Sequence, residues 1–333
     1  MSEVHPYHNE LSSSTKKSMK SRVLVALIFL LILLPLIILG DYFYLVGALI
    51  LFGIAESEVI NAIKGTDKKF SIAFYIISYL TLYLPILFTA LFNFLISNTL
   101  PFYDLINDFS SIYIAPISLL INLIILITLA LIDKKVSLND IIYIFFFNII
   151  LSLSLLSLLY LRFYPLYETL DGNGVYSNGV LVYERIGTSL NLFIYVIIGI
   201  CFNDIFAYFS GVLFGKHKMC PTISPKKTWE GFVGGVLGSF LFSFLFAILL
   251  AYFNYPIIEI LDLNHRYIIL IISLILPLVG TIGDLLFSQL KRHFGIKDFG
   301  TILKSHGGIL DRIDSITLGT IVTAIILSTI NLF

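Results

Sequence analysis

The chain has 333 residues, of which 58% are hydrophobic and 13% charged, and its formal net charge is zero. The charged fraction is about half the roughly 25% that is usual in soluble domains, so the composition excludes an ordinary soluble globular protein. A neutral chain gives no electrostatic indication of nucleic acid, and no nucleic-acid partner is expected. The two cysteines, Cys201 and Cys220, suggest neither a disulfide framework nor a zinc site.

Apolar segments along the chain are long enough to cross a bilayer, which takes about 20 residues of helix. Residues 1–22 are a polar tail, and the apolar run after them is interpreted as an uncleaved helix, because no small-residue cleavage site follows. We therefore predict an all-α, polytopic transmembrane bundle of about nine spans. The expected spans, in chain order, are 23–40, 42–63, 70–96, 111–132, 140–163, 187–214, 231–253, 266–290 and 315–333.

The second of these helices is the weakest prediction. Glu56 and Glu58 interrupt its apolar sequence. We expect its last turns to lie along the cytoplasmic interface.

Basic residues predict the orientation of the bundle. If the N-terminus is cytoplasmic, 18 of the 21 Lys and Arg residues fall in cytoplasmic segments. Only Arg162, Arg185 and Arg266 fall outside. The prediction is a cytoplasmic N-terminus, an outer C-terminus and a location in the cell membrane.

Composition changes near residue 200. The first five predicted helices are nearly free of polar residues, whereas the later ones carry or border acids, lysines and glycines. We divide the chain into a cytoplasmic tail at 1–22, membrane scaffold helices at 23–186, and catalytic helices with cytoplasmic loops at 187–333. Function is expected in the last part.

In the sixth predicted helix, Asp204, Tyr208 and Gly211 share one face at positions i, i+4 and i+7. An acid within a span costs a few kcal/mol on insertion scales, so Asp204 is a functional candidate. The alternative is an acid that only joins two helices by a hydrogen bond.

The next loop contains Ser224, Lys226, Lys227 and Thr228, and follows Lys216 at the end of the sixth helix. Thr228 is placed to cap the following helix, whose N-terminus attracts phosphate. Such a loop suits a triphosphate; alternatively, its lysines merely mark the cytoplasmic side.

The seventh predicted helix begins with two overlapping GxxxG pairs, formed by glycines at 231, 234, 235 and 238. Small residues let helices approach closely in lipid, so this stripe predicts a close helix contact, within one subunit or between two.

The strongest group lies at the end of the eighth predicted helix. Asp284, Ser288 and Lys291 fall on one face, and Asp311 and Asp314 are one helical turn apart at the start of the ninth. Mg²⁺ is commonly held by one or two carboxylates together with waters and substrate phosphates. The pattern therefore favours phosphoryl chemistry, with surface ion pairs among Asp311, Arg312 and Asp314 as the alternative.

His306 precedes two glycines, and it is either a base or a residue that shapes the turn.

The residues from Ser288 to Asp314 resemble the signature of the phosphatidate cytidylyltransferase family. The similarity covers residues 200–320, including the stretches around Asp204 and 224–231, while the first 200 residues agree only in being serial membrane helices. The signature comprises Ser288, Lys291, Arg292, Lys297, Asp298, His306, Gly307, Gly308, Asp311, Arg312 and Asp314.

The resemblance implies a multispan enzyme, expected as a homodimer, that joins CTP to phosphatidate with release of pyrophosphate. It implies Mg²⁺ as the cofactor, with a second cation such as K⁺ as an option. Asp284 and Asp311, supported by Asp314, are the implied metal ligands, and Ser288 and Lys291 complete the implied catalytic group. The implied substrate-binding residues are Asp204, Lys216, Ser224, Lys226, Lys227, Arg292, His306 and Arg312.

Two other functions fit parts of the pattern. A CTP-dependent polyprenol or lipid kinase would use similar phosphate and metal chemistry on another lipid. A cation- or proton-coupled transporter would use Asp204 and Asp284 as an ion path, but the polar residues gather at helix ends and do not form a chain across the membrane.

Overall fold

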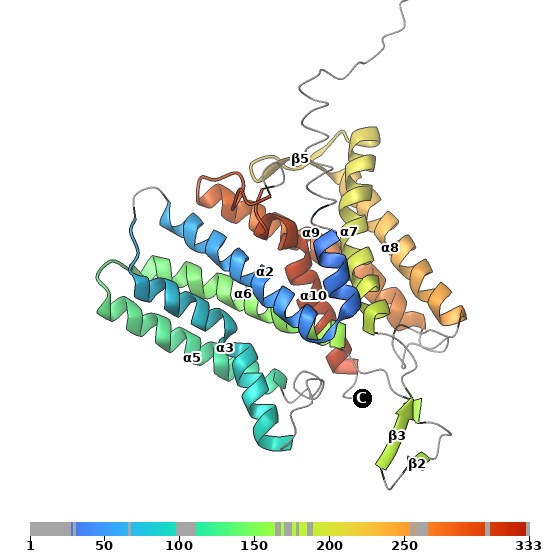
Figure 1. Ribbon diagram of the computed structural model, residues 1–333. Helices are drawn as coiled ribbons and strands as arrows, with labels where there is room; N and C mark the ends of the chain where they lie inside the picture. Colours follow the sequence, from blue (N-terminus) through green and yellow to red (C-terminus); the bar gives the residue numbers. More distant parts are fainter. Residues whose placement is uncertain are drawn as a thin grey trace, which may run out of the picture.

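A computed structural model gives the architecture of the chain (Figure 1). It describes residues 28, 31–65, 68–97, 111–163, 168–169, 175–177, 180–184, 189–253, 257, 266–303 and 307–330. The tail at 1–22 and the last three residues lie outside this part of the chain, so the predicted sides of the two termini stay predictions.

Long helices dominate the described residues, as the sequence predicts. Their bounds are α2 (Asp41–Lys64), α3 (Ile72–Ser97), α5 (Ser111–Ile132), α6 (Leu138–Phe163), α7 (Ser189–Phe214), α8 (Trp229–Tyr252), α9 (Arg266–His293) and α10 (Leu310–Ile330). A further helical stretch covers 31–39. Six helices (α2, α3, α6, α7, α8 and α9) are long and apolar enough to cross a membrane. A polytopic helical bundle is therefore confirmed, while the count of nine spans stays a prediction.

Five short strands accompany the helices within the described residues. Strands β1 (Glu168–Thr169), β2 (Val175–Ser177) and β3 (Val180–Glu184) form an antiparallel sheet in the order β1-β3-β2. Strand β3 reads Val-Leu-Val-Tyr-Glu, and its β-branched and aromatic residues favour a strand. Strands β4 (Lys218–Cys220) and β5 (Ser224–Thr228) pair as a hairpin, in which a proline is tolerated because the ribbon has two free edges.

Helix α6 packs against α2, α3, α5 and α10, and in Figure 1 it runs between α2 above it and α3 and α5 below it. Helices α7 and α8 pack against each other and complete the side of the bundle beyond α9 and α10. Two contacts show that the end of α2, the start of α6 and the end of α9 lie at the same end of the bundle. Lys68 after α2 binds Asp140 in α6, and Tyr143 in α6 contacts His293 at the end of α9.

The structure shows how the end of α2 accommodates its two carboxylates. The helix continues to Lys64 as a regular element, and Glu56 and Glu58 are 0% and 2% exposed. The placement of these last turns along the cytoplasmic interface stays a prediction, while within the bundle Glu58 is buried against the backbone where α10 begins.

The scaffold helices also contain more polar contacts than their composition suggests. The amide of Asn148 in α6 donates to the hydroxyl of Thr81 in α3, and Asn122 in α5 donates to the carbonyl of the same threonine, at 2.8 and 2.9 Å. Ser154 in α6 contacts Thr320 in α10 at 3.3 Å. Buried polar groups join helices where lipid provides no hydrophobic force between them.

The glycine stripe of α8 lies against α7 in the same chain. A Cβ at Gly231 would stand 2.8 Å from the carbonyl oxygen of Ala207, and one at Gly235 would stand 2.9 Å from the Ala207 methyl group. The predicted close helix contact is therefore confirmed as a contact within one subunit. It fixes α7, which carries Asp204, against the start of α8.

Candidate active site

Helix α9 presents the predicted face where it leaves the bundle. The hydroxyl of Ser288 donates to Asp284 Oδ1 at 3.3 Å, one turn away, and Lys291 follows on the same side. Gly283 lets α10 come close, because a Cβ there would lie 2.8 Å from the carbonyl oxygen of Asp314. The two helices that carry the acids are thus in direct backbone contact.

Lys291 and Asp311 form the buried centre of this region. The ammonium of Lys291 lies 2.9 Å from Asp311 Oδ1 and 3.9 Å from Asp314 Oδ2. Asp311 Oδ2 accepts hydrogen bonds from the backbone N–H groups of Phe299 and Gly308, both at 2.9 Å. Both oxygens of Asp311 therefore have partners, and the residue holds the α9–α10 loop as well as the lysine.

The burial of these acids contradicts the alternative of a surface ion-pair cluster. Asp311 and Asp314 are each 8% exposed, and their shared partner Lys291 is 9% exposed. The ring of Phe299 lies below the same ammonium, with its centroid 5.7 Å away. Ion pairs this deeply buried are costly to break, which separates them from surface pairs.

The β4–β5 hairpin brings a second lysine to the site. Lys227 in β5 lies 2.5 Å from Asp284 Oδ2, so it does more than mark one side of the membrane. Thr228 caps α8 by accepting the N–H of Gly231 at 3.1 Å, as predicted. Lys226, the residue before Lys227, is exposed, and Ser224 is the first residue of β5.

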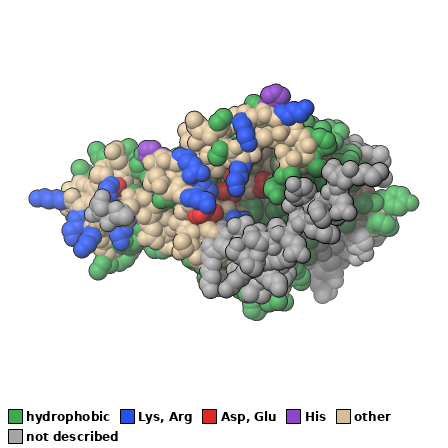
Figure 2. All heavy atoms as spheres, turned by 90° about the horizontal axis from the view of Figure 1, so that it is seen from above, with side chains coloured by type: hydrophobic (Ala, Val, Ile, Leu, Met, Phe, Trp, Pro, Cys, Tyr) green, Lys and Arg blue, Asp and Glu red, His purple; other side chains and the backbone are tan. Residues whose placement is uncertain are grey.

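Asp204 joins the same group from α7. Its carboxylate interacts electrostatically with Asp284, Lys227 and Arg312, and also with Asp314. Three acids from three helices therefore face one region, which the sequence predicted for two of them. Figure 2 shows Lys and Arg side chains gathered on this face of the molecule, with carboxylates between them.

The remaining predicted residues lie around this centre. Arg292 is exposed and donates from Nε to the carbonyl of Ile223 at 3.3 Å, which ties the end of α9 to the hairpin. The backbone N–H of Lys216 donates to Glu230 at 3.1 Å, while its side chain is exposed. Arg312 is exposed in the first turn of α10. His306 lies outside the described residues, and its role stays a prediction.

Glu58 is a residue of this region that the sequence reasoning missed. Its two carboxylate oxygens accept the N–H groups of Ile309 and Leu310 at 3.0 and 2.8 Å, where α10 begins. Side chains at Gly300 and Gly308 would collide with this carboxylate. An anion at a helix N-terminus is favourable, and here it comes from α2 in the scaffold half. The glycines of the α9–α10 loop were the available indication that something packs tightly against it.

The carboxylates of the site form an incomplete set of ligands for a metal ion. No three His, Cys, Asp or Glu side chains converge closely enough to form a metal cage within the described ranges. Asp284 and Asp314 nevertheless offer hard oxygen atoms on neighbouring helices, and Mg²⁺ typically keeps several waters and substrate phosphates. The donor set fits such a shared ion if Asp284 exchanges its partly exposed partner Lys227 for it, whereas the partners of both Asp311 oxygens are buried within the chain.

Comparison with known proteins agrees with the geometry. The model of the cytidylyltransferase family matches residues 20–330. A phosphatidate cytidylyltransferase of Staphylococcus saprophyticus is 41% identical over 134 residues, which are 40% of this chain and 48% of the relative. One from Staphylococcus aureus strain COL is 42% identical over 134 residues, and one from Staphylococcus haemolyticus is 40% identical over 136, each over 40% of this chain and 47% of the relative. The chain thus matches about half the length of these curated relatives.

Proposed function

Because the chain belongs to the cytidylyltransferase family, we propose that it transfers the cytidylyl group of CTP to phosphatidate, giving CDP-diacylglycerol and pyrophosphate for phospholipid synthesis. One observation carries the proposal at the level of structure. Asp204, Asp284 and Asp314 from three helices meet Lys227 and Lys291 at one end of a membrane bundle. A lipid headgroup and a water-soluble nucleotide can both reach such a position.

The reaction joins two anions. An oxygen of the phosphatidate phosphate attacks the α-phosphorus of CTP, and the bond from that phosphorus to the oxygen bridging the β-phosphate breaks. Pyrophosphate leaves with the electron pair of the broken bond. A monoester phosphate is already largely ionised at neutral pH, because its second pKa is about 6, so the attack needs no strong base.

Charge neutralisation and positioning are therefore the main tasks of the protein. We assign Lys227 and Lys291 to the phosphates, with Ser288 as a hydrogen-bond donor beside them. Lys291 is held in place by Asp311 and lies over Phe299, so its ammonium is fixed before substrate arrives.

We propose that further groups near these two lysines bind the nucleotide or the headgroup. Those with exposed side chains are Asp204, Lys216, Lys226, Arg292 and Arg312. The half-buried Ser224 is added to them, and so is His306, which lies outside the described residues and is included on the family resemblance alone.

Mg²⁺ is the proposed cofactor, held by Asp284 and Asp314 together with substrate phosphates. When bound, it supplies positive charge to the phosphate oxygens. Asp311 can join this set only by releasing Lys291 or the two loop N–H groups, since its oxygens are engaged. A second cation such as K⁺ is compatible with the three acids that face one region.

We further propose that the site faces the cytoplasm of a cell-membrane protein that works as a homodimer. The orientation is supported by the distribution of the basic residues, and the dimer by the family resemblance alone.

Product analysis tests the proposed reaction. Purified protein with CTP, phosphatidate and Mg²⁺ is expected to yield CDP-diacylglycerol by mass spectrometry, with one pyrophosphate released for each lipid converted. CDP formed along with a phosphorylated lipid alcohol would instead support the kinase. CTP-independent ion flux in sealed vesicles that Asp204→Asn abolishes would support the transporter.

A further inference from the structure

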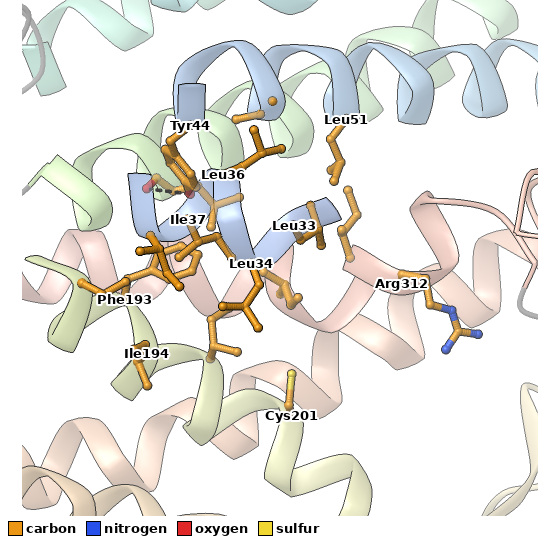
Figure 3. Close-up of a pocket in the computed structure, with 18 of the residues that line it drawn as sticks. Leu33, Leu34, Leu36, Ile37, Tyr44, Leu51, Phe193, Ile194, Cys201 and Arg312 are labelled. Atoms are coloured by element: carbon orange, nitrogen blue, oxygen red, sulfur yellow. Dashed lines mark hydrogen bonds between the residues drawn. The ribbon is translucent and has the colours of Figure 1, made fainter. Parts of the chain in front are cut away.

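An apolar cavity of about 790 Å³ lies beside the site, with Arg312 in its lining. The stretch 31–39, α2, α7 and α10 enclose it, and Leu158 of α6 and Leu303 of the α9–α10 loop complete its lining. Figure 3 shows leucine and isoleucine side chains of these elements pointing toward one another, with Arg312 set apart at one end.

The lining is almost uniformly hydrocarbon. Arg312 is the one charged residue among the described residues that border the cavity. The hydroxyl of Tyr44, another lining residue, donates to the carbonyl of Leu158 at 3.3 Å and is thereby satisfied within the protein. Ligands of this cavity therefore need an apolar body, and any anionic group would lie at the end where Arg312 lies.

The cavity leads from the site into the bundle. Arg312 follows Asp311 directly and interacts with Asp204, so the charged end adjoins the acidic group. From there the lining continues along α7 from Cys201 to Leu190. Eleven residues of helix rise about 16 Å, at roughly 1.5 Å per residue. That length is close to one half of the roughly 30 Å hydrocarbon core of a bilayer.

We propose that this cavity binds an acyl chain of the lipid substrate, with the guanidinium of Arg312 holding the phosphate at its entrance. The inference rests on the proposed function and gives the lipid a defined place within it. A guanidinium binds phosphate through two parallel hydrogen bonds, so it fixes the headgroup in one orientation. Each methylene buried in the cavity adds to affinity, and the phosphate is thereby held next to Asp311 and Lys291.

Narrowing the cavity tests this proposal. Ala48 of α2 lines it, whereas Val46 on the same helix is 51% exposed on the outer surface. Ala48→Phe is expected to raise KM for dioleoyl phosphatidate about tenfold, or roughly 1.4 kcal/mol. KM for CTP and turnover of dihexanoyl phosphatidate should stay within twofold of the parent. Val46→Phe is the matched control and should leave all three values unchanged.

The outcomes separate the cavity from the proposed function. If the parent protein forms no CDP-diacylglycerol from either lipid, the proposed function is wrong, and the acyl-chain site in the cavity falls with it. An active parent whose Ala48→Phe variant treats long and short chains alike, or loses both equally while staying folded, overturns only the acyl-chain site.

Photolabelling covers the case in which Ala48→Phe does not fold. A phosphatidate with a diazirine at the end of one acyl chain is expected to label peptides of the cavity lining, near Phe193 and Ile197 in the unmodified protein. Labelling confined to lipid-facing residues such as Val46 and Ile50 would overturn the proposal.

Discussion

Two lysine–aspartate pairs lie next to each other in the site, and they differ in burial. Lys291 and Asp311 have side chains that are 11% and 3% exposed, whereas those of Lys227 and Asp284 are 26% and 25% exposed. Asp311 also accepts two backbone N–H groups, while Asp284 binds only the hydroxyl of Ser288 and its lysine among the described residues. One pair maintains the local fold, and the other remains accessible to a ligand.

This difference assigns separate tasks to residues that look equivalent in the sequence. Removing the charge of a buried, fully bonded acid leaves its lysine uncompensated, which costs stability. Removing the charge of a half-exposed acid costs little stability, so any loss of activity reports on substrate or metal directly. Activity and stability should therefore separate at Asp284 and fall together at Asp311.

The largest effect is expected for Asp284→Asn. Turnover should fall by roughly 10² to 10³, the range seen when one preorganised electrostatic group is removed, with unfolding free energy changed by less than about 1 kcal/mol. Steady-state rates and thermal unfolding in detergent measure both. Asp133→Asn, the same charge change in the loop before α6, is the control; an Asp284→Asn enzyme within severalfold of the parent would exclude this residue from the site.

Asp311→Asn should lower both stability and activity. Lys291 would lose its anionic partner, and an amide NH₂ would face either the ammonium or the two loop N–H groups. We expect about 3 kcal/mol of destabilisation, together with a large fall in turnover. Thermal unfolding distinguishes this variant from Asp284→Asn, and equal stability of the two proteins would contradict the proposed division of tasks.

A smaller effect is expected where α2 supports the start of α10. Glu58→Gln replaces an oxygen that accepts an α10 N–H by an NH₂ group, which should cost about 1–3 kcal/mol. Glu58 acts as a positioning residue, so kcat should fall severalfold while KM for CTP stays nearly constant, and Glu58→Asp should recover part of kcat.

Glu56→Gln is the matched control, because Glu56 is equally buried but neither of its oxygens has a hydrogen-bond partner among the described residues. It should be nearly neutral, since an unpartnered buried carboxyl group is replaced by an amide of the same shape without loss of a hydrogen bond. If Glu56→Gln lowered stability and kcat more than Glu58→Gln does, the positioning role assigned to Glu58 would be wrong.

The smallest contrast concerns the two lysines of β5. Lys227→Gln should raise KM for CTP about tenfold, or roughly 1.4 kcal/mol, because this ammonium is fixed at Asp284. Lys226→Gln should raise it less, since that side chain is exposed. Initial rates over a range of CTP concentrations at fixed ionic strength test the order, and a larger effect at Lys226 would reverse it.

Local spacing predicted much of this site. The face of Asp284, Ser288 and Lys291, the helical turn between Asp311 and Asp314, and the Thr228 cap all depend on short-range helix geometry, and each is found. The apolar runs likewise predicted the long helices, because a segment of that length and composition must satisfy its backbone internally in lipid.

Long-range partners were not predictable in this way. The contact between Glu58 and the start of α10 joins residues about 250 positions apart, and no periodicity relates them. The burial of Asp311 and the pairing of Lys227 with Asp284 also depend on how helices and the hairpin pack together. Composition alone also cannot distinguish a hydrated carboxylate from one buried within the bundle, as Glu56 and Glu58 are.

The central claim is that the α-phosphorus of CTP is transferred to a lipid phosphate at the Asp284 face. It is tested most directly by incubating parent protein, Asp284→Asn and Asp133→Asn with phosphatidate, Mg²⁺ and CTP labelled at either the α- or the γ-phosphorus. The predicted result is α-label in the lipid for the parent and Asp133→Asn, little for Asp284→Asn, and γ-label only in pyrophosphate. Lipid that acquires the γ-label, or α-label transferred equally by all three proteins, would contradict the account.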